Sequence, residues 1–294
     1  MPLVIKEDTS KPTYTKHDQL FKELINEFFK EFLEAFFPEV HDNIDFHAIK
    51  PLPDEVYTDL LKGSTRRLDI VIETTLKGTD AVVIIHVEPQ SYKQDGFHER
   101  MYHYFSLLYN KYQMPIVPIA VFSYEEDWEK DQYTMELAFF RVFTFNYITL
   151  HLRKKNWRDY IRTDNPAAAA LLSKMGYKQE ERVQVKKEFL RMITRMKLDP
   201  ARERLIYGFF ETYLQLTEAE EEKLMEEVEN LPKEEAELIK ELSISYEERG
   251  KEIGRIDGKK EVAMEMLRKG LNMDLIAEVT HLDMEEIEKL KEQL

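Results

Sequence analysis

The sequence predicts an α/β domain followed by an α-helical region. Between residues 18 and 150, apolar segments with the two-residue period of strands alternate with segments that have the period of amphipathic helices. From Pro166 onward only the helical pattern remains. Aromatic residues crowd residues 14–160 and become sparse after Tyr213. We therefore expect a compact front portion, in which helices flank a sheet, and a looser helical back portion.

The composition excludes several classes of protein. The chain of 294 residues contains no cysteine, so a disulfide framework and a cysteine-based zinc site are both excluded. No apolar run approaches the length of a membrane span, and residues 1–11 lack the apolar core of a secretory signal. We expect a cytoplasmic protein without a membrane partner. The net charge of −15 argues against a large surface that coats nucleic acid without specificity.

The first predicted element is a helix over residues 18–36. Asp18 is placed to act as its N-cap, and Pro38 is expected to end it. Its apolar residues recur at helical spacing: Leu20, Phe21, Leu24, Ile25, Phe28, Phe29, Phe32, Leu33 and Phe36.

Strands are predicted next, over residues 66–75 and 81–90, with a turn at 77–80 between them. The second is apolar almost to its end, which is typical of a central strand that is buried on both faces. An amphipathic helix over 95–112 and a third apolar strand over 116–123 follow. The apolar and aromatic pattern of residues 137–150 predicts one strand or a strand pair.

The back portion predicts a series of helices, over 166–175, 180–197, 200–215, 217–229, 233–268, 272–280 and 283–292. Gly250, Gly254 and Gly258 form one stripe of a weak, charged helix, which suggests a linker or an oligomerisation arm. The last helices look like a small helix-turn-helix unit with few cations, which favours packing or dimer contacts over DNA reading. We expect three regions, 12–160, 161–245 and 246–294.

Two acidic residues stand out on the predicted strands. Asp69 lies on the first strand, and Glu88 closes the second, where His86, Glu88 and Gln90 share a face. A carboxylate at the end of a buried strand needs a cation nearby, because burial of an unpaired charge is costly. If both acids converge at one edge of the sheet, they can bind a divalent metal. Glu73, about 13 Å along the strand from Asp69, is a weaker candidate.

Other interpretations of these residues stay open. Asp69 and Glu88 could instead form structural ion pairs with Arg66 or Arg67. His86 could be a metal ligand or, more ordinarily, a core histidine.

The ordered set of short motifs resembles a known family. The motifs are H-D-Q-L-F-K at 17–22, R-L-D-I-V at 67–71, H-V-E-P-Q-S at 86–91 and R-M-Y-H-Y at 100–104, with M-L-x-x-G and I-A-x-x-T near the C-terminus. This set is similar to PD-(D/E)xK nucleases, and more narrowly to the recombination-promoting nuclease (Rpn) family, also described as YhgA-like transposases. The resemblance spans most of the chain and is densest over 17–123.

The resemblance implies a restriction-endonuclease-like core with a mixed central sheet. It also implies a DNA endonuclease that depends on Mg²⁺ (or Mn²⁺) and is linked to recombination or mobile elements. By position, Asp69 and Glu88 correspond to the two metal-binding acids, and Gln90 stands where most of the superfamily has a lysine. Glutamine can orient a water but adds no charge. Lys93 could reach back and supply that charge.

Further residues are candidates for supporting roles. Asp18 could hold a water of the metal site, or simply cap its helix. Arg100 and Tyr104, one helical turn apart, could contact a phosphate, although Arg100 could equally pair with Glu73 or Glu88. The cation-rich segments 153–158 (Arg153, Lys154, Lys155 and Arg158) and 182–204 are either the approach for DNA or solvated helix faces.

Three functions are therefore compared. The first is a metal-dependent DNA endonuclease. The second is a DNA-binding or regulatory module that keeps the nuclease fold, has lost turnover and self-associates through its C-terminal helices. Gln90 and the charge of −15 favour this second class. The third is a strand-joining transposase, which needs a third essential acid that the sequence does not clearly provide.

Overall fold

The structure, a computed structural model, describes residues 11–52, 70–88, 96–123 and 131–292. It divides into two compact units, Met1–Val228 and Glu229–Leu294. The predicted boundary after residue 160 falls inside the first unit. The predicted boundary after residue 245 falls inside one continuous helix of the second.

The first unit is built on a mixed sheet of five described strands in the order β1-β2-β3-β4-β7. β1, β2 and β3 pair antiparallel, whereas β3, β4 and β7 run parallel. The predicted central position of β3 is confirmed. The strands are β1 (Lys50–Pro51), β2 (Ile70–Leu76), β3 (Thr79–Glu88), β4 (Ile116–Phe122) and β7 (Ile148–His151).

A two-residue turn joins β2 to β3 and fixes their register. Lys77 and Gly78 both have positive φ, 46° and 85°. Positive φ at both central residues defines the type I′ turn, whose twist matches that of an antiparallel hairpin. The register then runs from Leu76 opposite Thr79 to Ile70 opposite Ile85. The predicted turn is confirmed, but it is shorter than 77–80.

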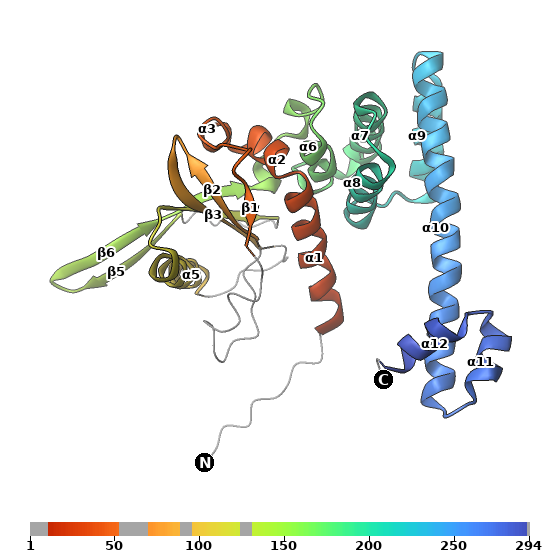
Figure 1. Ribbon diagram of the computed structural model, residues 1–294. Helices are drawn as coiled ribbons and strands as arrows, with labels where there is room; N and C mark the ends of the chain where they lie inside the picture. The colour runs from red at the N-terminus through yellow and green to blue at the C-terminus, as the bar shows by residue number, and fades with distance from the viewer. Residues whose placement is uncertain (1–10, 53–69, 89–95, 124–130, 293–294) are drawn as a thin grey trace. The chain divides into compact units, whose positions relative to one another are not determined.

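Each face of this sheet is covered by helices. On one face, Ile72 and Val83 are buried, and β3 also contacts α1. On the other face, Val71 packs against Tyr104 and Leu108 of α5 (Phe97–Tyr112). Figure 1 shows β2 and β3 between the α2–α3 segment and α5. The middle of the sheet is therefore shielded from solvent on both faces.

The N-terminal helices correct one prediction. The helix begins at Lys11, not at Asp18, so Asp18 lies within the helix and the N-cap interpretation is wrong. Pro12 is tolerated in the first turn, where the backbone N–H has no partner to lose. The helix also breaks at Phe28, and Pro38 starts a further short helix at its N1 position. The elements are α1 (Lys11–Glu27), α2 (Phe29–Phe36) and α3 (Pro38–His41).

The helices after the sheet agree with the sequence prediction. They are α6 (Pro166–Leu171), α7 (Arg182–Met196), α8 (Pro200–Tyr213) and α9 (Glu218–Glu229). Every residue of α6 is buried, and its four alanines allow neighbouring helices to approach closely. Asn165 caps α6 by accepting from the Ala168 N–H at 2.9 Å, and its amide donates to the Glu31 carbonyl of α2 at 2.8 Å.

A second, two-stranded sheet forms a hairpin, β5 (Gln132–Leu137) and β6 (Phe140–Asn146). The strand pair predicted over 137–150 is correct in kind but wrong in its limits. The first strand begins five residues earlier than predicted, and residues 148–151 belong to the main sheet as β7.

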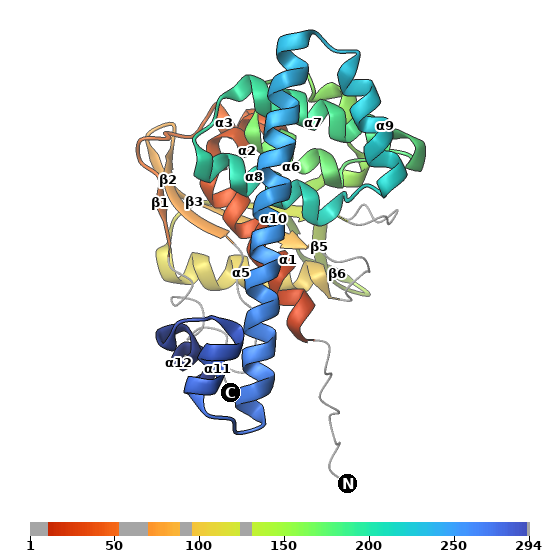
Figure 2. The same ribbon diagram turned by 90° about the vertical axis from the view of Figure 1, so that its right-hand side faces the viewer.

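The second unit contains α10 (Lys233–Arg268), α11 (Met273–Thr280) and α12 (Met284–Lys291). Figure 2 shows α11 and α12 at the C-terminal end of α10. Their small core consists of Ala263, Ile276, Leu282 and Ile287. The predicted terminal helical unit is thus confirmed. Among the helices that the structure describes, none is long and apolar enough to cross a membrane.

Candidate functional site

The carboxyl ends of the three parallel strands meet at one edge of the sheet. Glu88 ends β3, Phe122 ends β4 and His151 ends β7, and the register places Glu88 beside Phe122 and Phe122 beside His151. Neighbours in register share a face of the sheet. In open α/β sheets, ligands bind outside this edge. The end of β3 is therefore in a position suited to a functional group.

That face of the sheet is the one covered by α5. Phe122 is fully buried and packs against Phe97 and Met101 of the first turns of α5, with the Phe97 and Phe122 ring centroids 5.0 Å apart. The helix starts at Gly96, whose φ of 77° lies in the left-handed region that glycine tolerates. The position of Glu88 therefore belongs to the side of the sheet where α5 begins, and the helix N-terminus carries a partial positive charge.

Polar side chains that the sequence did not single out lie around the same aromatic cluster. His98 Nδ1 is 2.5 Å from the Tyr147 hydroxyl, and Tyr147 is buried in the cluster with Phe97 and Phe122. The His151 ring stacks on Phe122 with centroids 4.7 Å apart. The sequence predicts a strand that ends near His151, but it does not predict the contact of His151 with Phe122. The hydrogen bond between His98 and Tyr147 joins residues 49 apart in sequence, and no local pattern marks it.

Five of the predicted site residues are described only in part or not at all. Asp69, Gln90 and Lys93 lie outside the described residues. Glu88 is described as the last residue of β3 and Asp18 as part of α1, but their side chains are outside the description. The distance between the two predicted acids is therefore untested.

The two predicted phosphate contacts on α5 are described. Arg100 lies over the Phe97 ring, 5.5 Å from its centroid. Tyr104 is only 4% exposed and faces the core beside Val71. Glu73, offered as an alternative partner of Arg100, forms an ion pair with Lys50 at 3.4 Å. Arg100 is thus the better placed of the two for a contact with a ligand.

The cationic segment 182–204 is largely neutralised within the first unit. Six of its eight cations form ion pairs, and five of these pair with carboxylates of other helices or loops, so they help to hold neighbouring segments together. The pairs are Arg182–Glu220, Lys186–Glu211, Lys186–Glu221, Lys187–Glu227, Arg191–Glu188, Arg195–Asp164 and Arg202–Glu27. These internal pairs reduce the charge that the segment could offer to DNA.

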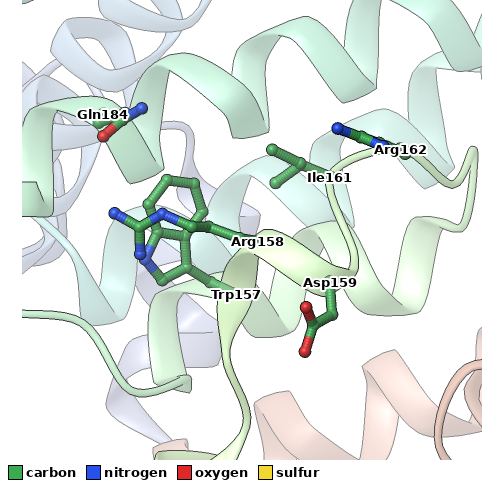
Figure 3. A pocket seen from close by; sticks show the side chains of 6 residues that line it. All are labelled: Trp157, Arg158, Asp159, Ile161, Arg162 and Gln184. Carbon is green, nitrogen blue, oxygen red and sulfur yellow. The ribbon is translucent and has the colours of Figure 1, made fainter.

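The other cationic segment borders a surface hollow of about 540 Å³ (Figure 3). Arg158 lies over the Trp157 ring, 4.3 Å from its centroid, and forms an ion pair with Glu181. The Trp157 indole N–H is buried and has no hydrogen-bond partner within the described part of the chain. The hollow is lined by Trp157, Arg158, Asp159, Ile161, Arg162 and Gln184. With two arginines and one aspartate, it carries a weak positive charge.

A third cluster surrounds Lys174, at the end of the 3₁₀ helix Leu172–Lys174. Its ammonium lies 4.4 Å from the Tyr213 ring centroid, and the Tyr213 hydroxyl is 3.0 Å from His17 Nδ1. Burial, and secondarily the charge of Arg153, lowers the pKa of Lys174 to about 8. Burial and the Lys174 charge also lower the pKa of His17. His17, the first residue of one family-like motif, thus helps to join α1 to α8.

Within the residues whose side chains are described, no group of three His, Asp or Glu is arranged to hold a metal ion. That search does not reach Asp69 or the Glu88 carboxylate. No protein-family model, curated protein or solved structure matches this chain.

Proposed function

We propose that this protein is a magnesium-dependent DNA endonuclease with a PD-(D/E)xK-like core, and that Asp69 and Glu88 bind its metal. One observation supports this most directly. Val71 and Phe122 both pack against α5, so they mark the same face of the sheet. Glu88 is the register neighbour of Phe122, and Asp69 precedes Val71 by two residues. The proposal requires that β2 extends by one residue at its N-terminal end. Strand alternation would then assign Asp69 and Glu88 to this same face.

The donor set fits a hard cation. Mg²⁺ uses oxygen ligands and is commonly held by one or two carboxylates together with water. Bound at this edge, it would lower the pKa of a water and stabilise negative charge on a phosphate. Asp69 and Glu88 would supply the carboxylates. A link to recombination or mobile elements rests on the motif resemblance alone.

The remaining residues of the proposed site would position the reactants. Gln90 can hold a water by hydrogen bonds but cannot supply charge. Lys93 and Arg100, the latter in α5, are the first two lysine or arginine residues that follow Glu88 in the sequence. They would attract the phosphate and partly replace the missing lysine.

The test is cleavage of supercoiled plasmid by wild type, Asp69→Asn and Glu88→Gln, each with and without Mg²⁺. We expect nicking that requires Mg²⁺ and falls at least about a hundredfold in both variants, because each removes a metal ligand. Glu73→Gln is the matched control. Glu73 lies on β2 and on the same face as Val71, but it is paired with Lys50. Its removal should leave the rate within about twofold of wild type.

Two results would count against the proposal in different ways. Mg²⁺-dependent cleavage that survives both substitutions would contradict the assignment of Asp69 and Glu88 as metal ligands but would support the nuclease activity. The complete lack of metal-dependent cleavage by wild type would contradict the proposed nuclease activity.

The second candidate is a DNA-binding or regulatory module without turnover. The internal pairing of most cations in 182–204 leaves little of that charge for a fast encounter with DNA, which favours the regulatory form of this candidate over rapid turnover. Mobility-shift binding of a DNA duplex without any cleavage, in the presence of Mg²⁺, would support this candidate.

A further inference from the structure

The β5–β6 hairpin is amphipathic along its whole length. Residues directly opposite on paired strands share a face. The register pairs Tyr133 with Phe145, Met135 with Phe143, and Leu137 with Phe140, which gathers these six on one face. A register shift after Met135 keeps this separation to the end of the hairpin. The opposite face is polar and carries Thr134, Glu136, Arg141 and Thr144.

Only the base of the apolar face is covered. Tyr102 of α5 stacks on Phe143 with ring centroids 4.6 Å apart, and Phe105 lies 4.9 Å from Phe145. Beyond α5 the hairpin continues outward (Figure 1). There the apolar side chains are exposed, and we call four of them the distal patch: Met135 (41%), Leu137 (51%) and Phe140 (59%) on the apolar face, with Phe139 (88%) in the turn.

The distal patch is large enough to form an interface. A Phe side chain contributes roughly 150–250 Å² when fully buried. At the exposed fractions above, the four side chains offer on the order of 500 Å². Two such patches together bury about 1,000 Å², the lower limit for a specific protein–protein interface.

We propose that the distal patch binds the same patch on a second copy of this chain. Between residues 132 and 146 the hairpin has one acid and one base, Glu136 and Arg141, which lie 3.5 Å apart on opposite strands. A neutral surface of this kind does not suit a polyanion or an anionic membrane. It suits the same uncharged apolar patch on an identical hairpin, which a two-fold axis can bring face to face without charge repulsion.

The backbone supports the same partner. Within the described residues β5 and β6 pair only with each other, so each strand keeps one edge with unpaired N–H and C=O groups. An open edge beside an apolar face readily pairs with an identical strand. An isolated two-stranded hairpin is also marginal in stability, so a partner would rigidify it.

Sedimentation of the full chain over a range of concentrations tests the proposal. We expect a dimer for wild type, and a dissociation constant at least about tenfold higher for Leu137→Ser with Phe140→Ser. Both side chains are exposed, so the melting temperature should stay close to that of wild type. The matched control is Leu238→Ser with Ile244→Ser, which changes two equally exposed apolar residues of α10 (52% and 57%) and should leave the dimer intact.

Cysteine cross-linking provides an independent readout, since the chain contains no native cysteine. The single substitution Phe140→Cys should give a disulfide-linked dimer under mild oxidation, whereas Ile244→Cys should not. A wild type that stays monomeric at the highest concentration would overturn the proposal. So would a dimer that survives the hairpin substitutions and is lost with the α10 control.

Discussion

Replacing Lys186 by methionine is expected to lower the free energy of unfolding of the first unit by about 3 kcal/mol. Lys186 is 4% exposed, and its ammonium lies 2.8 Å from Glu211 and 2.6 Å from Glu221. Methionine keeps the apolar stem but leaves both carboxylates without their cation. The two carboxylates retain some contact with solvent, which places the cost at the lower end of the range for a broken buried ion pair.

The size of this loss should depend on pH. Burial raises the pKa of Glu211 above its ordinary value even though Lys186 opposes that shift. A carboxyl group with a raised folded-state pKa stabilises the fold below its unfolded pKa, and this stability is lost as pH rises through the folded pKa. Without Lys186 the pKa of Glu211 should rise further. The deficit of the variant should therefore shrink between about pH 7.5 and about pH 5, as the Glu211 carboxyl takes up a proton.

Urea unfolding at both pH values measures this effect, with Lys187→Met as the matched control. Lys187 is the next residue of α7 and forms a single ion pair with Glu227 at 2.7 Å, but its side chain is more exposed. Its loss should cost about 1 kcal/mol or less. Equal effects of the two substitutions, or a Lys186 deficit that does not change with pH, would contradict this account.

Replacing Gly176 by alanine should be similarly damaging, by about 3 kcal/mol or more. A Cβ at Gly176 would lie 2.3 Å from the backbone oxygen of Arg153 and 3.4 Å from that of Lys155. The clash is with backbone, so side-chain rotation cannot relieve it. The Gly176 N–H also donates to the Lys155 carbonyl at 3.0 Å, and separation of the two segments would weaken that bond. Thermal unfolding followed by circular dichroism measures the loss.

Gly208→Ala is the control, and it is expected to raise the free energy of unfolding where Gly176→Ala lowers it. Gly208 is an exposed residue inside α8, and an added Cβ would meet nothing within 4 Å. Alanine there should stabilise the protein by up to about 1 kcal/mol, because glycine loses more conformational freedom in a helix. If Gly176→Ala did not lower the melting temperature relative to wild type, the close approach of the backbone at Gly176 would be contradicted.

Local patterns in the sequence predict much of the fold. The strand period and the Lys77-Gly78 turn identify the β2–β3 hairpin. The helical period identifies α5 and the helices after Pro166. Local patterns fail where position depends on distant contacts. Nothing near Asp18 indicates that the helix already starts at Lys11, and nothing near Ile148 indicates that β7 leaves the hairpin to pair with β4.

The same distinction applies to the candidate site. The end-of-strand position of Glu88 follows from the apolar run before it, because the alternation and length of β3 are local properties. The neighbours of that position follow from the order of strands in the sheet and from the placement of α5. For this reason the stack of His151 on Phe122 and the pair of His98 with Tyr147 could not be derived from spacing.

Binding of Mn²⁺ as a spectroscopic substitute for Mg²⁺ tests the central claim most directly. Electron paramagnetic resonance of free Mn²⁺ should show a site on the wild-type protein that Mg²⁺ displaces. Asp69→Asn and Glu88→Gln should each weaken that site at least about tenfold, whereas Glu73→Gln should not. Wild-type affinity in both Asp69→Asn and Glu88→Gln would show that these two acids do not share a metal ion.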